Sequence, residues 1–179
     1  MKETLISAEY IYKGKIVTLR KEQVLTSHGI TATREIIEHA PAVVIIPMMD
    51  KDTIIMVRQY RRAVDQIFLE LPAGLINLKE EPLEAAKREL VEETGFLAAK
   101  WTFLTSAYAS PGFCDELMHF YLAEKLTLTT TCPDEDEVIV TKKMNFQALL
   151  KLITNGQMQD SKTIIGALLA KQHESNASF

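Results

Sequence analysis

The longest run of consecutive hydrophobic residues covers positions 42–49, with the sequence AVVIIPMM. A segment that is apolar at successive positions predicts a strand buried on both faces rather than on one. The β-branched segment 53–61 follows after the polar residues 50–52, so these two strands are expected to form the centre of a core sheet. Residues 103–110 and 116–128 predict two further strands on either side of a Pro-Gly loop.

A smaller β unit is predicted ahead of this sheet. Residues 15–24 and 31–39 are rich in β-branched side chains, and the turn-like cluster Thr26-Ser27-His28-Gly29 lies between them. This arrangement predicts an antiparallel hairpin. We therefore expect an N-terminal β-hairpin lobe at residues 1–40 and a main domain at residues 41–173, followed by a frayed tail at 174–179.

Three helices are predicted from their start and stop residues. Residues 82–94 begin with Pro82 and end at Gly95, which suit the first turn and the end of a helix. Asn145 can cap a helix over 146–155, and Asp160 can cap one over 161–172. Strands and helices together indicate an α/β (α+β) fold with a mixed sheet between helices.

Composition and charge exclude several classes of protein. The 179 residues are 47% hydrophobic, which predicts one sizeable core, and the net charge of −4 argues against a nucleic-acid partner. The longest apolar run is less than half of the roughly 20 residues needed to cross a membrane. Cys114 and Cys132 form no CxxC pair, and no signal peptide is evident, so we expect a cytoplasmic protein without a disulfide framework.

Three carboxylates share one face of the predicted helix 82–94. A rotation of about 100° per residue places Glu89, Glu92 and Glu93 within one arc. Like charges at these spacings repel, and the negative end of the helix is nearby, so a positive group is expected to compensate. Arg88 can supply part of this charge, and Mg²⁺ suits the remaining oxygen ligands. A solvated acidic helix face is the alternative.

The spacing of these acids resembles the signature of the Nudix hydrolase family. The matching residues are Gly74, Glu80, Arg88, Glu89, Leu90, Glu92, Glu93, Gly95 and Phe96. The resemblance implies the Nudix fold and an enzyme that cleaves a nucleoside diphosphate linked to another group. It further implies Mg²⁺ as the cofactor, with Mn²⁺ as a substitute. Lys79 stands where the family often has glycine.

The resemblance also implies a role for the residues of this signature, which is called the box below. Glu89 and Glu93 would be metal ligands, Glu92 would assist metal binding and catalysis, and the Ala73 carbonyl would provide a further oxygen. Glu80 and Arg88 would orient the loop and the helix.

Four other segments resemble ADP-ribose and nucleoside-diphosphate-sugar pyrophosphatases: residues 34–47, 57–61, 70–74 and 110–116. In this subclass a proline marks ADP-ribose-type substrates, and Pro111 stands sixteen residues after Gly95. Residues 134–137, DEDE, would carry the catalytic base Glu135 and the metal ligand Glu137, although a shift of two residues would exchange these roles. On composition alone this segment is a solvated turn.

Substrate contacts are implied less directly. The candidates are Tyr12, Arg34, Glu35, Arg61, Leu75, Pro111, Gly112 and Phe113. The arginines suit bidentate recognition of phosphate but could be surface cations, and Tyr12 could instead be a core aromatic of the hairpin. A two-stranded unit is marginal alone in water, which together with the resemblance predicts a homodimer.

The leading hypothesis is therefore Mg²⁺-dependent hydrolysis of the pyrophosphate bond of ADP-ribose or a related nucleoside diphosphate sugar, giving a nucleoside monophosphate and a sugar phosphate. One alternative is a Nudix pyrophosphatase acting on nucleoside triphosphates, which the segments 70–74 and 110–116 disfavour. A second alternative is a noncatalytic ADP-ribose-binding regulator. All box carboxylates are present and there is no basic patch, so catalysis is favoured.

Overall fold

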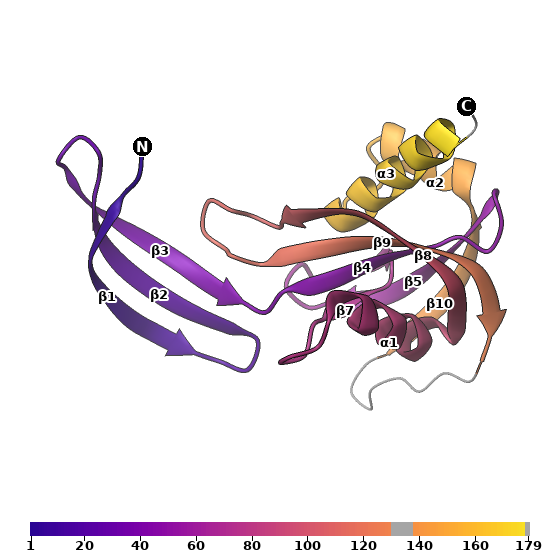
Figure 1. The fold of residues 1–179 in the computed structure, drawn as a ribbon, viewed down its shortest axis with the longest axis horizontal. Coiled ribbons are helices and arrows are strands. Elements are labelled where there is room, and N and C mark those ends of the chain that lie inside the picture. Colours follow the sequence, from indigo (N-terminus) through magenta and orange to yellow (C-terminus); the bar gives the residue numbers. More distant parts are fainter. Residues whose placement is uncertain (130–137, 178–179) are drawn as a thin grey trace. The chain divides into compact units, whose positions relative to one another are not determined.

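The structure of the protein is a computed structural model that describes residues 1–129 and 138–177. Its contacts divide the chain into two compact units. The first unit comprises Met1–Ala42 and Ser106–Met118, and the second contains Val43–Thr105 and the chain from His119 onward. The strands and helices of both units are labelled in Figure 1.

The first unit contains a three-stranded antiparallel sheet in the order β1-β2-β3. Strands β2 (Val17–Leu25) and β3 (Thr31–His39) form the predicted hairpin, with Leu25 paired to Thr31 next to the turn. The sequence pattern did not reveal β1 (Thr4–Lys13). All ten of its residues are exposed, so burial imposes no alternation of polar and apolar positions on this strand.

The Pro-Gly loop of the first unit continues the edge of β3. The Ile37 amide donates to the Phe113 carbonyl at 2.7 Å, and the Asp115 amide donates to the Ile37 carbonyl at 3.1 Å. The Asp115 carboxylate also accepts from the His39 amide at 2.8 Å. These bonds fix the segment around Pro111 and Gly112 beside the strand that carries Arg34 and Glu35.

The second unit is built from two sheets and three helices among its described residues. One sheet has the order β7-β4-β9-β8 and the other β10-β5-β6. The strands are β4 (Ala42–Pro47), β5 (Thr53–Arg61), β6 (Gln66–Glu70), β7 (Ala73–Leu75), β8 (Phe96–Tyr108), β9 (Leu117–Leu128) and β10 (Ile139–Asn145). The helices are α1 (Pro82–Thr94), α2 (Phe146–Thr154) and α3 (Ser161–Ala177). Figure 1 shows α1 on one side of the strands and α2 and α3 on the other.

Strand β4 is buried along its whole length, as predicted for residues 42–47. Val43 and Ile45 belong to the apolar cluster that includes Ala86 and Leu90 of α1. Ile46, on the opposite face, lies where a side chain on Gly166 of α3 would meet it at 3.1 Å. Helices therefore cover both faces of β4, which explains its unbroken hydrophobic sequence.

The three predicted helix starts and the predicted end of α1 are confirmed. Helix α1 begins at Pro82, and Gly95 ends it in the left-handed conformation at φ 71°, with its amide bonded to the Val91 carbonyl. The Asn145 side chain accepts from the Ala148 amide, and Asp160 accepts from the Thr163 amide. Helix α3 continues five residues beyond its predicted end at Gln172, so residues 174–177 are helical rather than frayed.

None of the helices in the described parts of the chain has the length and hydropathy required for a membrane span.

Candidate active site

Two of the box acids meet the same backbone bend at the start of β7. The carboxylate of Glu89 lies so close to Gly74 that a Cβ built there would be 2.0 Å from its carboxyl carbon. One residue earlier, the Ala73 amide donates to Glu93 Oε2 at 3.2 Å. Glu93 is only 7% exposed. The bend at Ala73 and Gly74 therefore lies against two carboxylates that come from successive turns of α1.

We expect Gly74→Ala to reduce activity strongly while changing the melting temperature little. The new methyl group would occupy the position of the Glu89 carboxylate, and this carboxylate can rotate away because it ends a flexible side chain. Thermal unfolding and steady-state kinetics measure the two effects. Wild-type activity in Gly74→Ala would show that the position of Glu89 is unimportant.

Arg88 provides the positive charge expected between the acids. Its Nη1 lies 2.6 Å from Glu89 Oε1 and 2.9 Å from Glu92 Oε2, so two box carboxylates converge on one nitrogen. Its Nε and Nη2 bind both oxygens of Glu80 at 2.9 Å. The hydrogen bond from Arg88 outweighs desolvation and lowers the pKa of Glu80 to about 2. The hydrogen bonds with the acids, that with Glu80 above all, raise the pKa of Arg88 despite partial burial.

The same arginine fixes the loop that precedes α1. Its Nη2 donates to the Leu75 carbonyl at 3.0 Å, and the Asn77 amide donates to Glu80 at 2.9 Å. Lys79 adopts the left-handed conformation at φ 67°. Glycine is the residue best suited to this conformation, which accounts for the glycine often found here in the family. Lys79 adopts the same conformation, so the departure from the family pattern leaves the turn intact.

The donor set of this site fits a hard divalent cation. Glu89, Glu92 and Glu93 offer carboxylate oxygens, and the bend at Ala73 adds backbone oxygens nearby. Among the described residues, however, no three acidic, histidine or cysteine side chains already stand in coordinating geometry. Arg88 holds Glu89 and Glu92, while Glu93 accepts from Ala73, so binding a cation requires these carboxylates to turn.

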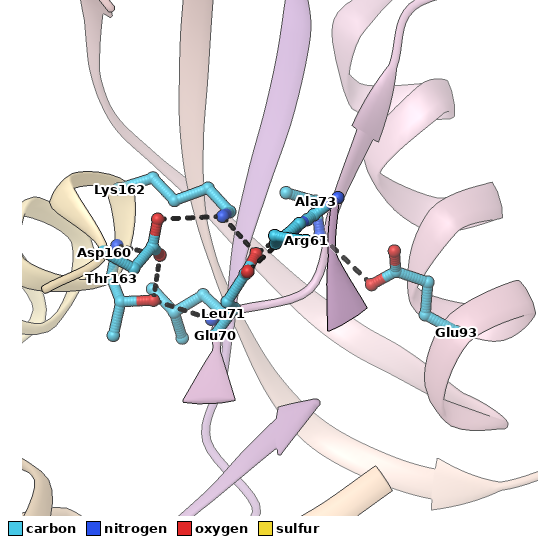
Figure 2. A network of polar contacts seen from close by, with 8 residues as sticks. All are labelled: Arg61, Glu70, Leu71, Ala73, Glu93, Asp160, Lys162 and Thr163. Atoms are coloured by element: carbon cyan, nitrogen blue, oxygen red, sulfur yellow. Dashed lines mark hydrogen bonds and ion pairs between the residues drawn. The ribbon is translucent and has the colours of Figure 1, made fainter. Parts of the chain in front are cut away.

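A second polar network adjoins the same bend (Figure 2). Glu70 has only 2% of its side chain exposed, and both of its oxygens bind Arg61, with Nε at 2.8 Å and Nη2 at 2.7 Å. Lys162 of α3 also contacts Glu70. Burial alone would raise the pKa of Glu70, but hydrogen bonding from Arg61 and the charge of Lys162 hold it below its ordinary value.

This network reaches the backbone next to the bend. Lys162 Nζ lies 3.0 Å from Asp160 Oδ1, and the Thr163 hydroxyl donates to Asp160 Oδ2 at 2.6 Å. The same hydroxyl accepts from the buried Leu71 amide at 2.8 Å. The sequence predicts Asp160 only as a helix cap, and Glu70 and Lys162 are not among the predicted site residues. The available signal was the single acid Glu70 within the largely apolar segment 67–73.

The predicted substrate contacts fall in both units. Arg61 and Leu75 belong to the second unit, together with the box acids. The contacts predicted in the first unit are Tyr12, Arg34, Glu35, Pro111, Gly112 and Phe113. Arg34 is paired there with Glu3. Tyr12 is 59% exposed, so it is not the core aromatic that was the alternative interpretation.

The predicted base Glu135 and metal ligand Glu137 lie outside the described residues. The residues on either side of this segment are bonded to the end of α1. The Thr129 amide donates to the Gly95 carbonyl at 2.7 Å, and the Thr141 hydroxyl donates to the Glu93 carbonyl at 3.2 Å.

Comparison with known proteins places this site in a family. The NUDIX domain model matches residues 38–164. The chain is 39% identical to the ADP-ribose pyrophosphatase of Bacillus subtilis (strain 168) over 165 residues, which cover 91% of this chain and 89% of that protein. It is 36% identical to a methanol dehydrogenase activator of Bacillus methanolicus over 165 residues, which again cover 91% of this chain and 89% of the other protein. The chain therefore belongs to the NUDIX domain family.

The fold is shared with a solved structure described as an ADP compounds hydrolase. The TM-score is 0.88, with 24% sequence identity, and the match covers 99% of this chain and 96% of the other. This likeness confirms the predicted fold class, a mixed α and β Nudix fold.

Proposed function

We propose that this protein is a Mg²⁺-dependent pyrophosphatase that hydrolyses ADP-ribose or a related nucleoside diphosphate sugar to a nucleoside monophosphate and a sugar phosphate. The observation that carries this proposal is the bend at Ala73 and Gly74, which lies against Glu93 and Glu89. The family match and the similarity to the ADP-ribose pyrophosphatase of Bacillus subtilis support the choice of substrate class.

In this proposal the residues of the site have three roles: holding the cation, accepting a proton from water, and binding phosphate. Glu89, Glu92 and Glu93, with the Ala73 carbonyl and Glu137, would hold the cation. When bound, Mg²⁺ supplies positive charge against the phosphoryl oxygens and makes water more acidic; Mn²⁺ can substitute for it. Glu135 would accept the proton of the attacking water. Arg61, which has 39% of its side chain exposed, keeps donors free of Glu70 and can direct them toward phosphate.

A substrate panel with Mg²⁺ tests the subclass. We expect kcat/KM for ADP-ribose or GDP-mannose to exceed that for ATP by at least about a hundredfold, equivalent to about 2.7 kcal/mol. Faster release of pyrophosphate from ATP would instead support a triphosphate pyrophosphatase. Tight ADP-ribose binding without turnover at any Mg²⁺ or Mn²⁺ concentration would support the noncatalytic regulator.

A homodimer is part of the proposal. Strand β1 is an edge strand of the first unit, and it exposes the large hydrophobic side chains of Leu5, Ile6, Tyr10, Ile11 and Tyr12. Exposed apolar edge strands invite pairing with another chain, and a second copy of this chain would cover the surface. In such a dimer Tyr12 and Arg34 would contribute to substrate binding across the interface.

Sedimentation at micromolar concentration should therefore give a species of twice the 20.2 kDa chain mass. Ile6→Lys together with Ile11→Lys should shift it to the monomer because two charges would be buried at the interface. Leu128→Lys is the control, since it adds a charge at another exposed apolar position, in the second unit. A 20 kDa wild-type species would contradict the dimer.

A reducing compartment accords with the free Cys114, and we propose a cytoplasmic location.

A further inference from the structure

Two residues in the first turn of α3 contact two adjacent residues, the last residue of β6 and the one that follows it. Lys162 contacts the carboxylate of Glu70, and the Thr163 hydroxyl accepts from the amide of Leu71. Asp160 joins the two by accepting from Lys162 and from Thr163. Figure 2 shows these contacts leading from α3 through Glu70 to Arg61 and from Thr163 to Leu71, and it shows the separate contact between Ala73 and Glu93.

Helix α3 also packs closely against Leu71. A Cβ on Gly166 would lie 2.5 Å from a methyl carbon of Leu71, which leaves no space for a side chain at this position of α3. Leu71 itself is fully buried. Leu71 is therefore held by α3 through both a hydrogen bond and van der Waals contact, two residues before Ala73.

The charges of the network balance in pairs. Arg61 and Lys162 are positive, and Glu70 and Asp160 are negative. Glu70 binds Arg61 in a bidentate manner, which fixes the plane of the guanidinium group. Lys162 also contacts Glu70, so Arg61 is not the sole cation that balances this carboxylate among the described residues. Without Lys162 the network would carry a net charge of −1.

We propose that the first turn of α3 is a positioning element for the active site: Lys162 acts through Glu70 to orient Arg61 and preserve its charge, and Thr163 acts through the Leu71 amide to hold the bend at Ala73. Neither residue contacts the substrate or the cation in this account. The inference rests on the proposed function for its kinetic test, but its structural test is independent of turnover.

Kinetics with ADP-ribose separate positioning from simple stabilisation. We expect Lys162→Met to raise KM about tenfold, equivalent to about 1.4 kcal/mol, and to leave kcat within about threefold. Lys162→Arg should restore KM because it retains the positive charge. Lys171→Met is the matched control: Lys171 lies on the same helix, pairs with Glu174 rather than with the residues of this network, and its substitution should leave KM unchanged.

A double mutant tests whether Lys162 acts through Arg61. Arg61→Lys loses the bidentate geometry and should itself raise KM. If Lys162 acts through Arg61, then adding Lys162→Met to Arg61→Lys should raise KM by less than about twofold more. Fully additive effects of the two substitutions on KM would overturn this pathway.

The Thr163 branch is measured without turnover. Thr163→Val removes the acceptor of the buried Leu71 amide, so the rise in melting temperature produced by Mg²⁺ should be smaller than in the wild type. Thr163→Ser should restore it. A lower melting temperature in Thr163→Val with an unchanged Mg²⁺ response would show that Thr163 only stabilises the fold.

A spectroscopic measurement keeps this proposal distinct from the proposed function. In ¹⁵N-labelled protein, Lys162→Met should shift the Arg61 Nε–H resonance, which is assigned by its loss in Arg61→Lys, whereas Lys171→Met should not. Absence of hydrolysis of every nucleoside diphosphate sugar would contradict the proposed function. The Arg61 resonance would still test whether Lys162 orients Arg61, because this measurement needs no turnover. An Arg61 resonance unchanged by Lys162→Met would overturn it.

Discussion

The Glu93→Gln substitution is expected to lower kcat/KM for ADP-ribose by about a thousandfold, equivalent to about 4 kcal/mol, while the protein remains folded. Glutamine keeps an acceptor oxygen for the Ala73 amide, so the buried hydrogen bond to the bend survives. It removes the negative charge that the cation needs, and it also relieves repulsion between neighbouring carboxylates on α1. The melting temperature without metal should therefore be unchanged or slightly higher.

Mg²⁺ provides a second measurement for this variant. An ion that binds only the native state raises the melting temperature by mass action, so Mg²⁺ should stabilise the wild type more than Glu93→Gln. Glu84→Gln is the matched control, because Glu84 is on the exposed part of α1 and pairs with Lys87. Activity within a few-fold of the wild type in Glu93→Gln would contradict the metal-ligand assignment.

The second large effect is expected in the acidic segment 134–137. Glu135→Gln should lower kcat by about a hundredfold or more and change KM little, since a general base acts in the transition state. Glu137→Gln should lower activity and also increase the Mg²⁺ concentration needed for half-maximal rate. This assignment depends on the resemblance to the family. The bonds from Thr129 and Thr141 to the end of α1 support it by tying both flanks of the segment to the box helix.

The two variants also distinguish the possible assignments. If Glu137→Gln loses kcat alone and Glu135→Gln changes the Mg²⁺ response, the two roles are exchanged. If both remain near wild-type activity, the base lies elsewhere in the chain. Lys142→Gln, an exposed substitution on the neighbouring strand β10, controls for a general change of charge in this region.

Local patterns were sufficient to predict the elements that bury their side chains or have clear ends. Strand β4 is apolar at every position because helices cover both of its faces, and α1 begins and ends at residues suited to helix termini. Strand β1 was missed because it is exposed along its whole length. Where burial does not constrain a strand, its sequence carries little periodicity.

In the site, too, only the features set by local sequence could be predicted, and contacts between residues distant in the sequence could not. The spacing of Glu89, Glu92 and Glu93 in one helix predicted a shared acidic face, which local geometry determines. The contact between Glu70 and Lys162 joins residues 92 positions apart, and nothing in either local sequence specifies this pairing. Gly74 was assigned from the family signature, but its physical role, to admit the carboxylate of Glu89, required the structure.

The central claim is the hydrolysis of a nucleoside diphosphate sugar at the box acids of α1, and product analysis of ADP-ribose with Mg²⁺ tests it most directly. The wild type should release AMP and ribose 5-phosphate in equal amounts, and both products should be absent when the metal is chelated or when Glu93→Gln replaces the wild type. Undiminished product formation by Glu93→Gln, or intact ADP-ribose and GDP-mannose after incubation with the folded wild-type protein and Mg²⁺, would contradict the account.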